Sequence, residues 1–153
     1  MSIHRADFKD IKTIQSVINK SNSEAYREIM PPEYFKEPVL TLDELQKDFR
    51  HMIFYIYEIE EKIVGVAALK VWDDEVGQIR WVYILPEYQK KRIGTALIIY
   101  IEKEAIKTNL KELRVLTNEN AYWARNFYVK LGYKLTDRVP RPWGDDIIYK
   151  KEL

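Results

Sequence analysis

The chain has no cysteine and only two histidines, and both shortages limit its chemistry. Without a thiol it can form no disulfide scaffold, no thiolate metal site and no cysteine nucleophile. His4 and His51 are the only imidazoles, so a multi-histidine metal site is not expected either. The sequence therefore predicts no metal site.

Long apolar runs and an excess of one charge are also missing. No stretch approaches the roughly 18 apolar residues of a membrane-spanning helix, and residues 1–7 carry no apolar segment of the signal-peptide type. The 25 basic and 24 acidic residues leave a net charge of +1, which gives no global field to hold nucleic acid or an anionic membrane. We therefore expect a cytoplasmic protein with no nucleic-acid partner and no membrane partner.

What the chain does have is enough apolar content for one core. Its 153 residues include 46% hydrophobic and 32% charged side chains, which is typical of a single globular domain. No repeat, low-complexity tract or Gly/Ser linker interrupts the sequence. We predict one domain over residues 1–153.

The first third of the chain predicts an edge strand and two helices. Residues 2–5 are short enough for an edge strand, and Asp7 is placed to cap a helix. Apolar residues recur in that helix at helical spacing: Ile11, Ile14, Val17 and Ile18. Residues 22–38 are expected to be irregular because two prolines interrupt them. Thr41 and Glu44 then form a capping box that opens a second helix.

The rest of the chain predicts a meander followed by alternating helices and strands. The predicted strands are 53–59, 63–72, 76–85, 113–117, 133–139 and 146–151, and the predicted helices are 93–108 and 121–131. The first three of these strands have connections too short for crossovers, so they form an antiparallel meander. The pattern predicts a mixed α/β (α+β) fold of about seven strands and four helices in the order βααββββαβαββ. One parallel crossover spans residues 76–117.

The most informative passage runs from Val82 to Ala96 and reads VYILPEYQKKRIGTA, a strand, a loop and a helix. The first turn of the helix carries unpaired N–H groups and the positive end of the helix dipole. Gly94 lets a ligand approach the backbone, and the basic run before it adds positive charge. The loop therefore predicts an anion site, typical of phosphate binding. A solvated basic loop in front of a core helix is the alternative.

This passage resembles the GNAT superfamily of N-acetyltransferases. The family signature Q/R-x-x-G-x-G/A follows a strand that ends in V-x-P, and here QKKRIGT at residues 89–95 follows ILP at residues 84–86. A second segment, YVKLGY at residues 128–133, is similar to the family's Y-x-x-x-G-F. The order of elements agrees over nearly the whole chain. The resemblance implies the GNAT fold, in which strands four and five splay apart.

Two positions depart from the family pattern. Arg92 stands where the family usually has its first glycine, and we expect it to donate its backbone N–H from a conformation with negative φ. The family's helical asparagine falls at Ala121, while Asn120 lies one place earlier. Asn120 either substitutes for that asparagine or only caps the helix.

The resemblance also implies the donor and its binding site. Acetyl-CoA would insert its pantetheine arm between Tyr83–Leu85 and Leu116–Thr117, and the backbone N–H of Ile84 would polarise the thioester carbonyl. The amides of residues 92–95 would hold the pyrophosphate, together with Gln89. The implied donor-binding residues are Tyr83, Ile84, Leu85, Gln89, Lys90, Lys91, Arg92, Ile93, Gly94, Thr95, Asn120 and Tyr128.

The implied reaction is direct attack of a primary amine on the acetyl group through a tetrahedral intermediate. Tyr128 matches the family's general acid, which would reprotonate the departing thiolate. A buried structural aromatic is the other interpretation of Tyr128. Gln78 replaces a glutamate that serves several members as the base, so Glu58, the turn at residues 73–75, or a water relay would take that role.

The acceptor is left open. Residues 22–50 hold seven acidic and four basic side chains, a local charge of −3. That charge suits a cationic amine, although a solvated acidic helix face also explains it. Tyr26, Tyr34, Phe35 and Trp143 are expected to form aromatic walls. A polyamine, an aminoglycoside-like amine, an amino acid, or a protein N-terminus or lysine would each fit, and a homodimer is common in the family.

Other functions keep the fold or the loop but change the chemistry. A longer acyl group would make a different acyltransferase. A non-catalytic acyl-CoA-binding or interaction module would explain Gln78 and the missing asparagine. A nucleotide-binding protein ranks behind both, because the chain lacks G-x-x-x-x-G-K-[ST] and G-x-G-x-x-G.

Overall fold

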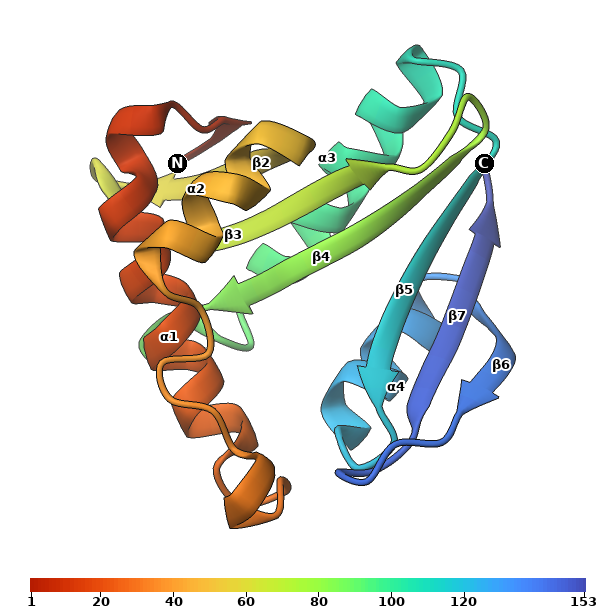
Figure 1. The fold of residues 1–153 in the computed structure, drawn as a ribbon. Coiled ribbons are helices and arrows are strands. Elements are labelled where there is room, and N and C mark those ends of the chain that lie inside the picture. The colour runs from red at the N-terminus through yellow and green to blue at the C-terminus, as the bar shows by residue number, and fades with distance from the viewer.

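One mixed sheet of seven strands runs through the computed structural model, which describes residues 1–153 (Figure 1). Its strands lie in the order β1-β2-β3-β4-β5-β7-β6. Their bounds are β1 Ser2–Arg5, β2 Met52–Ile59, β3 Lys62–Val71, β4 Val76–Ile84, β5 Glu112–Asn118, β6 Lys134–Val139 and β7 Asp146–Glu152. Only β4 and β5 pair in parallel. The mixed, mostly antiparallel sheet is therefore confirmed.

Helices cover both faces of the first half of the sheet and one face of the second. They are α1 Ile11–Tyr26, α2 Leu42–His51, α3 Ile93–Lys107 and α4 Tyr122–Lys130, with short 3₁₀ turns at Phe8–Asp10, Pro32–Tyr34 and Pro86–Tyr88. Figure 1 shows α1 and α2 in front of β2–β4 and α3 behind them. Helix α4 lies behind β5, so the front of β5–β7 carries no helix. No helix is long and apolar enough to cross a bilayer.

Three expectations about the elements were wrong. The predicted order βααββββαβαββ has four strands between the second and third helices, but residues 52–84 form only three, because three strands of 8 to 10 residues and two short turns fill that length. The segment expected to be irregular from residue 22 stays helical to Tyr26, since the prolines that break it begin only at Pro31. Asp7 precedes a 3₁₀ turn, Phe8–Asp10, rather than α1 itself.

The helix ends otherwise follow the sequence signals. Thr41 Oγ1 accepts from the Glu44 amide at 3.2 Å, and the Glu44 carboxylate accepts from the Thr41 amide at 3.0 Å. This reciprocal pair satisfies two N–H groups that the first turn of α2 would otherwise leave unpaired. Gly132 follows α4 with a φ of +94°, the left-handed conformation expected of a residue just past a helix.

The core lies between β2–β4 and the helices on either side. Seven consecutive residues of β3, Ile63 to Leu69, are buried, as expected for a strand covered on both faces. Gly65 allows α3 to come close: a Cβ there would lie 3.1 Å from Ile93 and 3.2 Å from Leu97. Strand β5 instead alternates, with Leu113, Val115 and Thr117 buried.

Strands β4 and β5 part soon after they begin. Their parallel ladder holds only three residue pairs, from Val76–Glu112 to Gln78–Arg114. Beyond Gln78 the two strands diverge and leave a V-shaped opening (Figure 1). The splay predicted from the family resemblance is therefore confirmed.

Candidate active site

A β-bulge in β4 prepares the strand for the opening. Trp81 and Val82 stand opposite the single residue Ala67 of β3, and Trp81 has a φ of +54°. A bulge bends its strand and re-aims the residues that follow, and a bulky side chain at positive φ is a strained backbone that the surroundings must hold. No local pattern predicts this bulge, because bulky residues such as Trp81 seldom adopt a positive φ.

The bulge aims the Ile84 peptide into the opening. Leu85 donates its N–H to Val64 O at 2.9 Å, and Ile84 stands opposite Gly65. In an antiparallel ladder this makes Gly65 and Ile84 a non-hydrogen-bonded pair, so the N–H and C=O of Ile84 point away from β3. They therefore face the side from which β5 has departed, where the resemblance placed an oxyanion donor.

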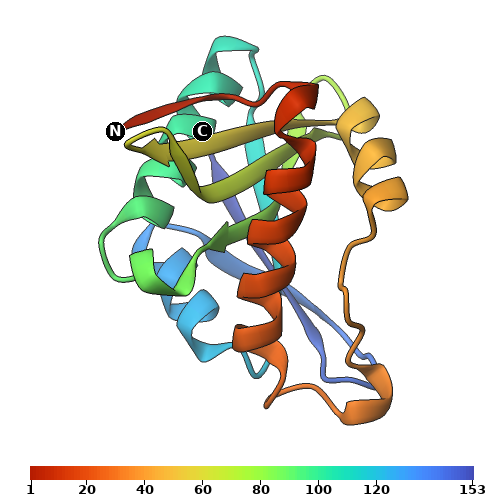
Figure 2. The ribbon, with the colours of Figure 1, turned by 90° about the vertical axis from the view of Figure 1, so that its left-hand side faces the viewer.

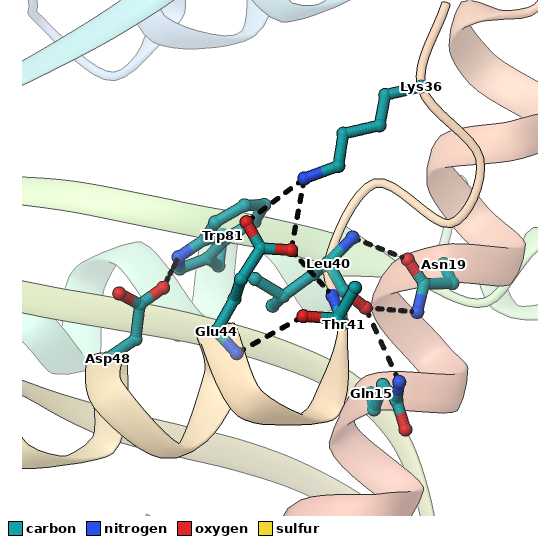
Figure 3. A network of polar contacts seen from close by, with 8 residues as sticks. All are labelled: Gln15, Asn19, Lys36, Leu40, Thr41, Glu44, Asp48 and Trp81. Atoms are coloured by element: carbon teal, nitrogen blue, oxygen red, sulfur yellow. Dashed lines mark hydrogen bonds and ion pairs between the residues drawn. The ribbon is translucent and has the colours of Figure 1, made fainter.

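Two side-chain hydrogen bonds hold the bulged segment in place. Trp81 Nε1 donates to Asp48 of α2 at 2.9 Å, as Figure 3 shows. Tyr83 donates its hydroxyl proton to Oδ1 of Asn22 at 2.8 Å, and Asn22 is a buried residue of α1. Both front helices thus hold one face of β4 just before Ile84.

The front helices are themselves joined by a polar network (Figure 3). Asn19 of α1 donates to Leu40 O at 2.9 Å and accepts from the Leu40 amide at 3.0 Å. Lys36 reaches the Glu44 carboxylate at 3.0 Å. The capping bonds of Glu44 and this lysine lower the pKa of Glu44 to about 2, so it is ionised at neutral pH. The network fixes α2, and with it Asp48, relative to α1.

The loop before α3 has the shape of an anion-binding concavity. Lys90 has a φ of +63° and Arg92 a φ of +62°, while Lys91 between them keeps a negative φ. Alternating handedness turns successive N–H groups toward one side, which is the geometry of a backbone nest. The expectation of a negative φ at Arg92 was wrong: the arginine adopts the conformation for which the family uses glycine.

The rest of the motif ties the loop to its neighbours. Gln89 donates from Nε2 to Ile84 O at 3.1 Å, which links the loop to the strand end. A Cβ at Gly94 would lie 3.3 Å from Cζ of Phe127, so this glycine lets α4 pack on the first turn of α3. Ile93 is buried, Thr95 is half-buried, and Lys90 to Arg92 are exposed.

Tyr128 lies on α4, and its ring packs edge-on against Phe127 and Tyr133. It is 4% exposed, and its hydroxyl makes no hydrogen bond within the chain. Burial raises the pKa of Tyr128 well above its usual range, and the phenol of Tyr26 adds to the effect. The pKa of Tyr83 is raised by burial and by Tyr26 and Tyr128, which places these three phenols near one another. Tyr128 is therefore protonated at neutral pH, and it lies in the neighbourhood of Tyr83, the residue before Ile84.

Aromatic contacts bridge the opening from the front. Tyr34 packs against Trp143 with ring centroids 5.6 Å apart, and Tyr26 packs edge-on against Trp123 at 5.7 Å. Figure 2 shows the orange chain after α1 descending to the blue loop between β6 and β7. Trp123 was missed from the sequence, because an aromatic on a short helix gives no sign of what it faces.

Other predicted residues lie differently from expectation. The Arg27 guanidinium lies over the Phe35 ring, with its Cζ 5.6 Å from the ring centroid. Trp143 packs against Tyr34 and not against Phe35. Ala121, not Asn120, is the N-cap residue of α4. Asn120 donates its amide to Asn118 Oδ1 at 2.8 Å in the turn that follows β5.

The carboxylates considered as bases lie away from Ile84. Residues 73–75 form the turn at the opposite end of β4. Glu58 pairs with His4 at 3.2 Å on the β1 side of the sheet. Gln78 ends the β4–β5 ladder, and its Oε1 accepts from Trp72 at 2.8 Å.

Together these features fit a long anionic thioester. The nest suits a pyrophosphate, the Ile84 N–H has no partner on β3, and β4 and β5 diverge beyond Gln78. Thr117 adds a buried hydroxyl without a hydrogen-bond partner on β5, beyond the ladder. No group of three or more metal-ligating side chains comes together anywhere in the molecule.

Fold and site therefore define a protein that binds an acyl-CoA in a splayed sheet. The model of the acetyltransferase (GNAT) family matches residues 20–133, and the chain belongs to that family. It is an acetyltransferase whose acyl donor is acetyl-CoA, as the sequence predicted.

Two full-length relatives are similar to the chain. A spermidine N(1)-acetyltransferase of Thermoplasma acidophilum is 25% identical, with 99% of this chain and 97% of the relative covered. The crystal structure of the PaiA N-acetyltransferase from Thermoplasma acidophilum in complex with coenzyme A has a TM-score of 0.80 at 25% identity, with both chains fully covered. An aminoglycoside 6'-N-acetyltransferase complexed with coenzyme A shares the fold, with a TM-score of 0.77 at 18% identity over 99% of this chain and 97% of that one.

Proposed function

We propose that the protein transfers the acetyl group of acetyl-CoA to a primary amine of a small polyamine, by direct attack of the amine. Two groups carry the proposal. The Ile84 N–H is not bonded to β3, and the Tyr128 hydroxyl has no hydrogen-bond partner within the chain. A donor and an acid at one point suit a reaction that builds negative charge on an oxygen and releases a thiolate.

Each group has one task in this proposal. The nest at residues 90–92 and Gln89 bind and orient the donor. The N–H of Ile84 stabilises the charge that develops on the acyl oxygen. Tyr128 holds its proton at any pH below its raised pKa and gives it to the departing sulfur. The proton of the amine leaves through water, because residues 73–75 and Glu58 lie elsewhere.

A cationic acceptor is supported by the charge at the mouth of the opening. Glu24, Glu28 and Glu33 lie on the end of α1 and the following segment, are exposed, and form no ion pair. Tyr34 of the same segment contacts Trp143 across the opening. A flexible chain with several ammonium groups can place one amine at Tyr128 while the others face these carboxylates. The full-length spermidine acetyltransferase relative adds to this choice.

Replacing Tyr128 with phenylalanine tests the mechanism. The loss of a positioned acid is expected to lower kcat by about 10² to 10⁴-fold and leave the affinity for acetyl-CoA within about threefold. Thiol release with spermidine measures the first quantity and calorimetric titration the second. Tyr133→Phe is the matched control: it removes a neighbouring phenol that donates to Glu102 at 2.8 Å, so it should lower the melting temperature but keep turnover.

The amine panel decides between acceptors. Spermidine should release thiol faster than an aminoglycoside, a free amino acid or a peptide with a free N-terminus. Unchanged turnover in Tyr128→Phe would remove this residue from the chemistry. Tight acetyl-CoA binding without thiol release from any amine would leave a non-catalytic acyl-CoA-binding module on the same fold.

A further inference from the structure

A pocket separate from the candidate active site lies at the C-terminal end of α3. The loop at residues 89–92, called the anion loop below, precedes the opposite end of this helix. The pocket measures about 740 Å³ and is formed by the back of β1–β3, the turn after β3 and the last residues of α3 with the loop that follows. Ile53, Leu69 and Leu110 give it an apolar floor. Its size lies in the range of small-molecule sites, about 300–1,000 Å³. Acetyl transfer as described above makes no use of this pocket.

A buried phenol faces this pocket without a partner. Tyr55 is only 5% exposed, and it lines the pocket from the middle of β2. Its ring packs edge-on against Tyr100 of α3 at 5.4 Å, which fixes its direction. Its hydroxyl makes no hydrogen bond within the chain, unlike those of Tyr57, Tyr83, Tyr133 and Tyr149. The hydroxyl oxygen is not among the fully buried unpaired atoms of the chain, so it reaches the pocket surface and is available to a ligand.

The polar rim of the pocket is mainly acidic. Asp73, Asp74 and Glu104 line it against the single guanidinium of Arg5. Glu104 has one exposed partner, Lys107 at 3.4 Å, and Asp73 uses one oxygen to cap the turn at Glu75. The carboxyl end of α3 adds the negative end of a helix dipole. The rim therefore favours a positive charge over an apolar floor.

We propose that this pocket binds a small organic ammonium ion with an apolar tail. The ammonium group would lie between Glu104 and Asp74, with a hydrogen bond to the Tyr55 hydroxyl, and the tail would cover Ile53 and Leu69. This arrangement pairs the buried phenol, and it places the charge where carboxylates and the helix end attract it. The site is separate from the opening between β4 and β5, so it stands whether or not the acceptor is a polyamine.

A matched set of probes tests the proposal by amide NMR shifts on the whole chain. Phenethylamine carries the charge and the tail, 2-phenylethanol has the tail alone, and phenylacetate reverses the charge. Phenethylamine should shift the amides of Arg5, Tyr55 and Asn109 in a saturable manner at millimolar concentration. The alcohol should bind about tenfold more weakly, and the acid should show no saturation.

Substitutions connect the binding to the named groups. Glu104→Gln should weaken phenethylamine about tenfold and Tyr55→Phe about fivefold, since each removes one polar contact without changing the shape. Asp137→Asn removes one exposed charge on β6, at the opposite edge of the sheet from the pocket, and should leave affinity within about twofold. Melting curves confirm that each variant is folded.

Three results would overturn the proposal. The amine and the acid could shift the same amides equally, which would remove the role of charge. Glu104→Gln and Tyr55→Phe could both leave the affinity unchanged. The shifts could instead map to Tyr83 and Tyr128, which would assign the amine to the catalytic opening and leave this pocket without a ligand.

Discussion

Strands β2–β4 are covered by helices on both faces, whereas β5–β7 are covered on one. Strand β3 shows the difference most clearly, with an unbroken buried run from Ile63 to Leu69. Strand β6 is exposed along nearly its whole length, and β7 alternates between buried and half-buried residues. The first half holds most of the core, and the second half is an arm whose strands join those of the first through only three residue pairs of β4 and β5.

The comparison teaches how the opening is built. Because helices cover β2–β4 on both faces, this half can stabilise the strained backbone at Trp81 of β4. Helices α1 and α2 accept hydrogen bonds from side chains of β4, and α3 packs behind the strand. The second half, covered on one face, diverges from β4 and carries Tyr128 on its helix α4. The proposed oxyanion donor, Ile84, and the proposed acid, Tyr128, thus come from opposite sides of the splay.

The largest expected effect comes from a substitution in the first half of the sheet, β2–β4, which helices cover on both faces. Leu97→Ala empties a site with 0% exposure on α3 and should lower the free energy of unfolding by about 2–5 kcal/mol. Leu135→Ala in the arm, where the side chain is 51% exposed, should cost less than about 0.5 kcal/mol. Urea unfolding measures both. Equal losses would show that the arm contributes as much core as the first half.

A second pair of variants compares the two walls of the opening. Tyr83→Phe leaves Asn22 unpaired in a buried place and should cost about 1–3 kcal/mol of stability and weaken acetyl-CoA binding. Thr117→Val on β5 removes a buried hydroxyl that has no partner, so it should be neutral or stabilising by up to about 1 kcal/mol. Chemical unfolding and calorimetry give both values. Loss of stability in Thr117→Val would mean that its hydroxyl is paired.

The anion loop offers a smaller, sharper test. Arg92→Gly removes a left-handed arginine and should raise stability by about 1 kcal/mol, whereas Arg92→Ala keeps the backbone cost. Both variants lose the same guanidinium, so the difference between them in melting temperature isolates the backbone. Identical melting temperatures would remove the strain argument.

The smallest effect concerns the front helices. The pKa of Glu44, lowered to about 2, means that its ionised form stabilises the folded state. That contribution is complete above its ordinary pKa of 4.5 and is lost as the pH falls toward 2. The side chain is 44% exposed, so Glu44→Gln should cost less than about 1 kcal/mol at pH 7. Thermal melts at several pH values should show the two proteins converging near pH 2.

Much of the site followed from local sequence signals. The capping box at Thr41, the glycine after α4 and the strand–loop–helix motif each depend on a few neighbouring residues, and the structure contains all three. The family resemblance predicted the splay and the places of Ile84 and Tyr128. The assignment of the catalytic roles stays a prediction that the variants above test.

Long-range geometry was not available from the sequence. No residue pattern near Trp81 predicts a bulge. The hydrogen bond from Trp81 to Asp48 spans 33 positions in the chain. The bond from Tyr83 to Asn22 spans 61 positions, and the contact of Tyr34 with Trp143 is longer still. Even Arg92 was assigned the wrong φ, because the loop around it, not the residue's own preference, sets its backbone.

The sequence by itself determined most of the order of elements, the strand–loop–helix motif before α3 and the family to which the chain belongs, because periodicity, caps and motifs depend on neighbouring residues. Only the tertiary structure decided which peptide faces the opening, which phenol stays unpaired and where a second pocket forms. Those features depend on the register of strands and the packing of helices far apart in the chain, and a single strand or helix in isolation possesses none of them.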